Sequence, residues 1–155
     1  MKNFVKIALA SALLAAPLPA FAATGNVQFD AVVNNTCTMV VGPAGVLDTN
    51  VGQTVLSSQT GAGTAGTAAI TATSGAFSVS IDTPTVFSAA PPTGGTNVTF
   101  AANYASAGAT TLAAANSARP LNTGVSNITV NMSATKSSGS FPTGTYAAIV
   151  VLRCE

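Results

Sequence analysis

Residues 25–37 read GNVQFDAVVNNTC, and their side chains alternate between apolar and polar. One side of an extended chain would carry four apolar residues: Val27, Phe29, Ala31 and Val33. The other side would carry four polar residues: Asn26, Gln28, Asp30 and Asn34. A period of two residues predicts a β-strand with one face suited to burial. A strand at the end of a chain can also leave its own domain and pair with the sheet of a neighbour.

The segment before this stretch, residues 1–22, has the pattern of a secretory signal. Lys2 and Lys6 give a positive start, residues 7–16 are apolar, and residues 20–22 form an Ala-Phe-Ala cleavage pattern. The apolar run is too short to span a bilayer, and no later run reaches that length. We therefore expect an exported protein that is not inserted in a membrane, with a mature chain beginning near Ala23.

The mature chain, of about 133 residues, is long enough for one domain with its own core. It has few charges, and their sum is about −1. The charged residues are Arg119, Lys136, Arg153, Asp30, Asp48, Asp82 and Glu155. Such a chain offers no basic surface for nucleic acid. Its low net charge also does little to oppose self-association.

The chain contains two cysteines, Cys37 and Cys154. In an exported protein this number favours one disulfide, which would join the first core strand to the last. Closing so long a loop would stabilise the fold by about 4–5 kcal/mol in the chain-entropy model. The alternative is that each thiol forms a bridge to another chain.

Short alternating or apolar runs, separated by Gly, Pro, Ser and Thr, predict an all-β sandwich. The strand candidates are residues 38–41, 46–47, 51–56, 67–73, 76–82, 84–87, 97–104, 126–134 and 145–154. The last candidate has one apolar face: Tyr146, Ala148, Val150, Leu152 and Cys154. Between them, residues 105–124 are rich in Ala, Ser, Gly and Thr, and part of this segment, 105–118, allows a helical turn but not a long helix.

The side chains needed for catalysis are scarce. The chain has no His and no Trp, and its one Glu is the terminal residue, which excludes a Ser-His-Asp triad and a typical zinc site. Asp30, Asp48 and Asp82 lie in three separate segments without the spacing of a calcium loop. The glycine-rich stretches 42–45 and 61–63 lack the lysine of a phosphate-binding loop. We expect turn-capping or solvated aspartates, no cofactor, no metal and no enzyme activity.

Three pieces of the sequence belong together: the signal, the extension ending in NNTCTMVV at residues 34–41, and the closing stretch FPTGTYAAIVVLRC at residues 141–154. In combination they resemble the subunits of chaperone–usher fimbriae, in particular the archaic branch with a spore coat protein U-like domain. In that family the closing strand has a Gly-x-Tyr start, which is Gly144-Thr145-Tyr146 in this chain.

The resemblance implies an incomplete Ig-like, pilin-type β-sandwich at residues 37–155 that lacks its last strand, preceded by a donor-strand extension at residues 23–36. Its donor side chains would be Val27, Phe29, Ala31 and Val33. The acceptor groove would be flanked by the first strand after Cys37 and by Tyr146, Ala148, Val150 and Leu152. A periplasmic chaperone would fill the groove during transit, and the next subunit's extension would fill it after assembly at an outer-membrane usher. The resemblance thus implies a fimbria or coat on the cell surface.

A second hypothesis is a self-contained extracellular β-sandwich that acts as a binding or adhesion module. In that case residues 25–34 would fold back into their own sheet. The two hypotheses therefore differ in whether residues 25–34 pair with their own domain or with another copy.

Overall fold

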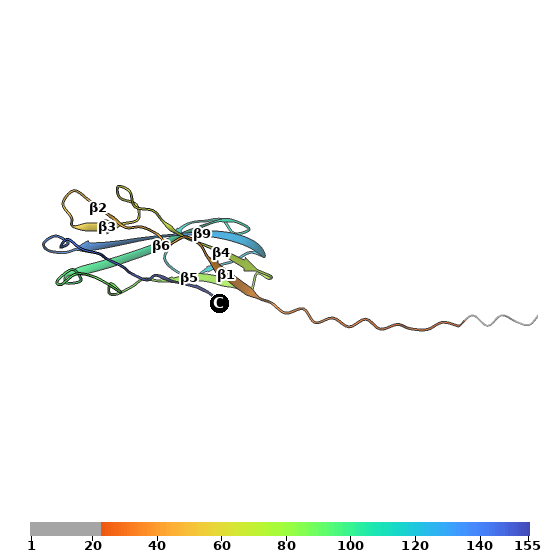
Figure 1. Ribbon diagram of the computed structural model, residues 1–155. Helices are drawn as coiled ribbons and strands as arrows, with labels where there is room; N and C mark the ends of the chain where they lie inside the picture. The colour runs from red at the N-terminus through yellow and green to blue at the C-terminus, as the bar shows by residue number, and fades with distance from the viewer. Residues whose placement is uncertain (1–22) are drawn as a thin grey trace, which may run out of the picture. The chain divides into compact units, whose positions relative to one another are not determined.

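The computed structural model describes residues 23–155, so the predicted signal at residues 1–22 lies outside the described part. Within residues 23–155 the fold is all-β, with ten strands and no helix. Residues 33–155 form one structural unit, and the segment that ends at Val32 belongs to a separate one. The strands lie in two antiparallel sheets (Figure 1).

The larger sheet is organised around its longest strand, β9, which pairs along one side with β6 over eleven residues. On its other side β9 pairs first with β4 and then with β3. β1 extends the sheet beyond β4, β2 extends it beyond β3, and β7 pairs with β6. Its seven strands are β1 (Cys37–Val41), β2 (Asp48–Thr49), β3 (Val55–Ser57), β4 (Gly66–Ala72), β6 (Val98–Gly108), β7 (Leu112–Ala115) and β9 (Gly124–Lys136).

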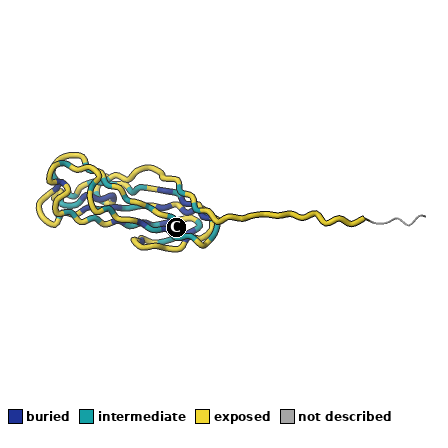
Figure 2. The backbone as a smooth tube through the Cα atoms, turned by 90° about the horizontal axis from the view of Figure 1, so that it is seen from below, coloured by how far each residue is buried: buried dark blue, intermediate teal, exposed yellow. Residues whose placement is uncertain are grey.

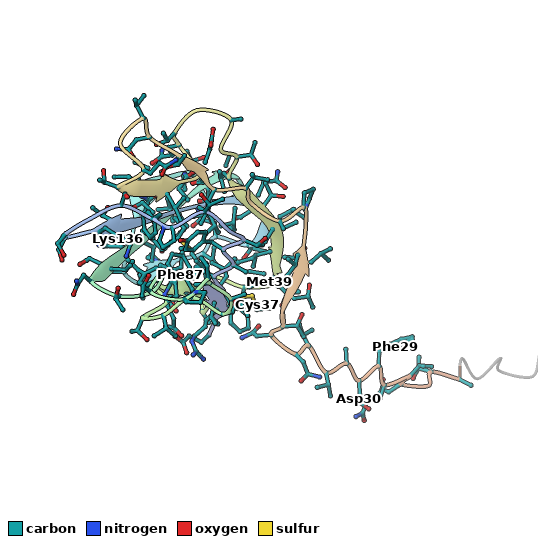
Figure 3. All side chains as sticks on the ribbon, turned by 60° about the vertical axis from the view of Figure 1, so that its left-hand side comes forward. Phe29, Asp30, Cys37, Met39, Phe87 and Lys136 are labelled. Carbon is teal, nitrogen blue, oxygen red and sulfur yellow. A yellow bond between two sulfur atoms is a disulfide. The ribbon has the colours of Figure 1, made fainter. Side chains whose placement is uncertain are left out.

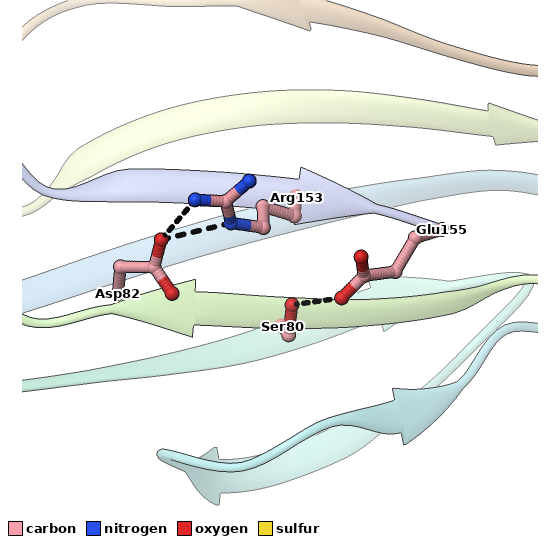
Figure 4. Close-up of polar contacts among 4 residues, drawn as sticks. All are labelled: Ser80, Asp82, Arg153 and Glu155. Atoms are coloured by element: carbon pink, nitrogen blue, oxygen red, sulfur yellow. Dashed lines mark hydrogen bonds and ion pairs between the residues drawn. The ribbon is translucent and has the colours of Figure 1, made fainter.

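The smaller sheet has the order β10-β5-β8. Its strands are β5 (Ser78–Asp82), β8 (Arg119–Pro120) and β10 (Val151–Cys154). Figure 4 shows two exposed polar contacts along it. Arg153 Nε donates to Asp82 at 2.8 Å, and Ser80 Oγ donates to Glu155 at 3.1 Å. Because both members of the ion pair are about half exposed, the pair contributes about 0–1 kcal/mol.

The core lies between the two sheets, as expected for a sandwich (Figure 2). The larger sheet contributes Ile70 and Ile128, and the smaller sheet contributes Val79 and Ile81. These apolar residues alternate along each strand with exposed or half-buried ones, so one face of each sheet is buried. The sequence prediction of an all-β, sandwich-like fold is confirmed at this level.

Tyr104 ties the two sheets together at the centre of this core. The side chain is fully buried, and its hydroxyl lies 2.9 Å from the carbonyl oxygen of Val79 and 2.7 Å from that of Ser117. Burial raises the pKa of this phenol above its usual value. The hydroxyl therefore stays protonated and acts as a donor to these carbonyls.

We expect Tyr104→Phe to lower the free energy of unfolding by about 1–2 kcal/mol, because the ring is kept while the buried carbonyls lose their donor. Urea denaturation of the wild type and the variant measures this difference. Tyr146→Phe is the comparison, since that hydroxyl donates to the Pro142 carbonyl in a less buried position and its loss should cost less. A larger loss for Tyr146→Phe than for Tyr104→Phe would contradict this prediction.

The predicted strand at residues 51–56 is wrong over its first four residues. Residues 51–54 form a turn, because the Asn50 side chain accepts hydrogen bonds from the N–H groups of Thr54 and Val55 at 2.8 and 3.1 Å. Asparagine side chains compete for backbone donors in this way at turns. The preceding candidate at 46–47 is also displaced, since Val46 makes only a single bridge to Thr64 and β2 begins at Asp48.

The Ala-rich segment contains strands rather than a helical turn. β6 continues to Gly108, and β7 and β8 follow within residues 112–120. Small side chains suit this part of the interior, and its buried hydroxyls are satisfied locally. Ser106 Oγ donates to the Thr110 carbonyl at 2.8 Å, and the Thr110 N–H donates to Ser126 Oγ at 3.0 Å.

Of two further predicted strands, one is absent and the other is shorter than expected. Residues 84–87 form no strand, and the nearby contact is a single bridge between Ala89 and Ala147. The strand predicted at 145–154 pairs with a neighbouring strand only from Val151 onward. Its residues 145–150 nevertheless keep a strict alternation between exposed and half-buried side chains.

Candidate functional site

Two strand edges without a partner lie at the boundary between the sheets. β1 ends the larger sheet and pairs only with β4, and β10 ends the smaller sheet and pairs only with β5. Among the described residues, no strand covers the other edge of either one. A disulfide between Cys37 and Cys154 joins the start of β1 to the end of β10, with their Cα atoms 6.3 Å apart. The predicted intramolecular disulfide is therefore confirmed.

An apolar groove of about 910 Å³ lies between these two edges. Met39 and Val41 of β1 line one side, and Leu56 and Met132 line its floor from the larger sheet. Tyr146, Ala148, Val150 and Leu152 line the other side. All four residues named from the sequence for this side of the groove therefore line it, whereas Cys154, the fifth residue of the same apolar face, does not.

The groove leaves apolar surface in contact with solvent. Val41 is 77 % exposed although it lines the groove, and Tyr146, Ala148, Val150 and Leu152 are only partly buried. Isolated exposed apolar residues are normal on a protein surface, whereas a continuous apolar groove usually indicates a binding site.

Backbone groups along the groove also lack partners. The N–H and C=O groups of Ala147 bond to Ser88 and Ala89, on the side away from the groove. Successive residues of an extended chain direct their backbone N–H and C=O groups to opposite sides. The N–H and C=O groups of Ala148 and Val150 therefore point toward the groove. Within the described residues, neither Ala148 nor Val150 has a backbone hydrogen-bond partner. The groove therefore offers both apolar contacts and a free strand edge.

An aromatic cluster holds the Tyr146 end of the groove in place. The Tyr146 ring packs edge-on against Phe87 and Phe141, with ring centroids 5.1 and 5.4 Å apart. Lys136 Nζ lies over the Phe141 ring, 5.4 Å from its centroid, and donates to the Thr93 and Thr96 carbonyls at 3.1 and 3.0 Å. Figure 3 labels Phe87, which is half-buried, and Lys136, which lies on β9. These contacts make the aromatic end of the groove a packed, pre-formed surface.

Asp48 lies at the groove and anchors a turn, in line with the capping role suggested by the sequence. Its carboxylate accepts hydrogen bonds from the N–H groups of Thr49 and Ala62 at 2.7 and 2.6 Å. These two bonds, that of Ala62 foremost, lower the pKa of Asp48 below its usual value. Within residues 23–155, no three His, Cys, Asp or Glu side chains gather as a metal site would require.

The extension that precedes β1 contains no strand in this structure, and residues 23–36 are all exposed. Phe29 is 91 % exposed, Val33 89 % and Val27 76 %. Figure 3 labels Phe29 and Asp30 on this segment. The four apolar residues of the predicted donor face are therefore not buried within the described chain.

The floor of the groove was not part of the sequence prediction. Leu56 comes from β3, whereas Val130 and Met132 come from β9, far along the chain, and the pairing of β3 with β9 brings them together. Their alternation with polar neighbours indicates a buried face. The same alternation does not indicate which edge of the sandwich lacks a neighbouring strand.

Comparison of the chain with protein-family models, with curated proteins and with solved structures finds no match in any of the three. The described residues contain no helix long and apolar enough to cross a membrane.

Proposed function

We propose that this protein is a structural subunit of a surface fimbria or coat, and that it polymerises by donor-strand exchange after export. The groove would accept the extension of another copy, and the domain would be an Ig-like sandwich completed in this way. A periplasmic chaperone and an outer-membrane usher are the proposed assembly partners. One observation carries the proposal: a groove with two free strand edges occurs in a chain that also has an exposed, alternating extension.

The groove and the extension match in length and pattern. The groove face from Tyr146 to Leu152 spans seven residues with four side chains directed inward, and residues 27–33 span seven residues with four apolar side chains on one side. An extended segment of this size is about 20 Å long. One strand of the extension therefore has the length and periodicity that the groove requires.

The energetics favour insertion. Burying four apolar side chains would contribute on the order of 6–10 kcal/mol before entropy losses, with the alanine contributing least. The strand would also give hydrogen-bond partners to the free backbone groups at Ala148 and Val150. A joint with both contributions would dissociate slowly.

Val32 and Val33 provide a matched test, because they are the same residue type and are 86 % and 89 % exposed in the described chain. We expect Val33→Asp to suppress polymers strongly, since it would place a charge inside the groove. Val32→Asp should leave polymers nearly unchanged, since its side chain would face solvent. Size-exclusion chromatography of the exported full-length protein measures the polymer fraction.

Equal effects of the two substitutions would contradict the proposal. A wild-type protein that remains a stable monomer at high concentration would support the self-contained binding module instead.

A further inference from the structure

We infer that Met39 is a site of reversible oxidation by a peroxide, and that its sulfoxide weakens the binding of another copy's extension in the groove. The oxidation itself follows from the chemistry and the exposure of the groove residues. Its effect on assembly rests on the function proposed above. An unfilled groove would therefore be sensitive to oxidants, whereas a filled one would be protected.

The methionines of the described residues gather in one place. The chain has three methionines, and the first, Met1, lies outside the described part. Met39 comes from β1 and Met132 from β9, yet both line the groove. Methionine suits such a surface, because its flexible, polarizable side chain packs against many shapes. Its thioether sulfur is also the atom that peroxides oxidise.

No free thiol in residues 23–155 competes for the oxidant. Cys37 and Cys154 are joined in the disulfide, and the described chain has no free cysteine. A free cysteine thiolate would react with peroxides by the same two-electron chemistry. The two thioethers are therefore the sulfur atoms at which a peroxide would act.

The two methionines differ in their access to water. Met39 is half-buried on the rim of the groove, in a strand whose outer edge has no partner among the described residues. Met132 lies on the floor, is only 8 % exposed and belongs to a buried cluster with Leu56 and Phe141. Because susceptibility to oxidation follows exposure, a peroxide dissolved in water reaches Met39 first.

The oxidation step transfers a single oxygen atom. A lone pair of the Met39 sulfur forms a bond to one oxygen of hydrogen peroxide, and the O–O bond breaks. The proton of the transferred OH group passes to the departing hydroxide, which leaves as water. Sulfur loses two electrons and the peroxide gains them. A methionine sulfoxide reductase reverses the step by supplying two electrons and two protons, which release the oxygen as water.

The product makes the groove polar at this position. In an open groove the sulfoxide oxygen is hydrated. A strand inserted in the groove removes that water, and its inward side chains, Val27, Phe29, Ala31 and Val33, offer no hydrogen-bond donor. An acceptor that is buried without a partner should weaken binding by about ten- to a hundredfold.

Strand insertion and oxidation therefore oppose each other. The inserted strand covers Met39 and keeps the peroxide from its sulfur, and the sulfoxide in turn weakens insertion. A ligand that shields a group slows the reaction of that group according to the fraction of copies that it occupies. A peroxide would thus stop copies that have not yet assembled and leave assembled joints intact.

Full-length exported protein with Phe29→Asp is the acceptor for the test, because its own extension should not insert. A synthetic peptide of residues 23–36 is the probe strand, and fluorescence anisotropy measures its dissociation constant. Peptide mapping by mass spectrometry measures the sulfoxide at each methionine. Met39→Leu and Met132→Leu in the same background are the matched variants, since leucine keeps an apolar side chain of similar volume without sulfur. Each variant is compared with its own untreated sample.

We expect hydrogen peroxide to oxidise Met39 faster than Met132 and to weaken peptide binding about ten- to a hundredfold. The loss should be as large in Met132→Leu and nearly absent in Met39→Leu. Methionine sulfoxide reductase should restore binding. Saturating peptide, added before the peroxide, should slow the oxidation of Met39 by about tenfold or more.

The outcomes separate the two levels of inference. Faster oxidation of Met132, or an unchanged rate at Met39 under saturating peptide, would overturn the assigned site. Oxidised Met39 with unchanged peptide affinity would overturn the effect on assembly and leave strand exchange intact. A peptide that does not bind untreated protein would overturn the proposed function, and the oxidation rates of the two methionines without peptide would still decide the site.

Discussion

Phe29→Asp should abolish polymers while leaving the melting temperature of the domain unchanged. Phe29 is 91 % exposed in the described chain, so its replacement removes no contact that stabilises the fold of a single copy. In the proposed joint the same side chain enters the groove, where its burial contributes about 1.5–3 kcal/mol. An aspartate there would add the cost of an unpaired buried charge, which is several kcal/mol. Together these effects correspond to a loss of about a thousandfold or more in affinity between copies.

Gln28→Asp is the matched control, because it introduces the same charge one residue away on the outward side of the strand. We expect it to polymerise nearly as well as the wild type. Light scattering coupled to size exclusion gives the polymer fraction, and calorimetry gives the melting temperature. Polymers that survive Phe29→Asp would show that the donor face is misassigned. A lowered melting temperature would show that Phe29 packs within its own molecule.

The elements that the sequence could predict are those set by local pattern. Alternation over residues 126–134 and 76–82 corresponds to β9 and β5, although β9 extends further at both ends and β5 begins two residues later. Two cysteines can form a single disulfide within one chain, and the structure contains that bond. In the last segment the alternation that placed Tyr146 to Leu152 on one face is present even where no neighbouring strand pairs with it. The alternation of side chains belongs to the extended backbone itself, so it can be recognised in the sequence without knowing which strand pairs with it.

The features that the sequence could not provide depend on contacts between distant segments. The turn at Asn50 replaces most of the strand predicted at residues 51–56, because one side chain accepts hydrogen bonds from two backbone N–H groups. The Ala-rich segment becomes strand because β9 supplies a full-length partner for β6, which overrides a neutral local preference. The groove itself is also such a feature, since the spacing between β1 and β10 depends on how both sheets pack.

Replacing both cysteines by serine should produce the largest loss of stability, about 4–5 kcal/mol in the free energy of unfolding. The bond joins residues 117 positions apart and closes a loop that contains nearly the whole domain, so its absence greatly increases the entropy of the unfolded chain. Domains of this size are typically stable by about 5–15 kcal/mol, so the Cys37→Ser/Cys154→Ser variant should unfold at a much lower urea concentration.

Wild-type protein under reducing conditions should behave like the serine variant, whereas reductant should have no further effect on the variant itself. An unchanged unfolding midpoint in the variant would contradict the chain-entropy account.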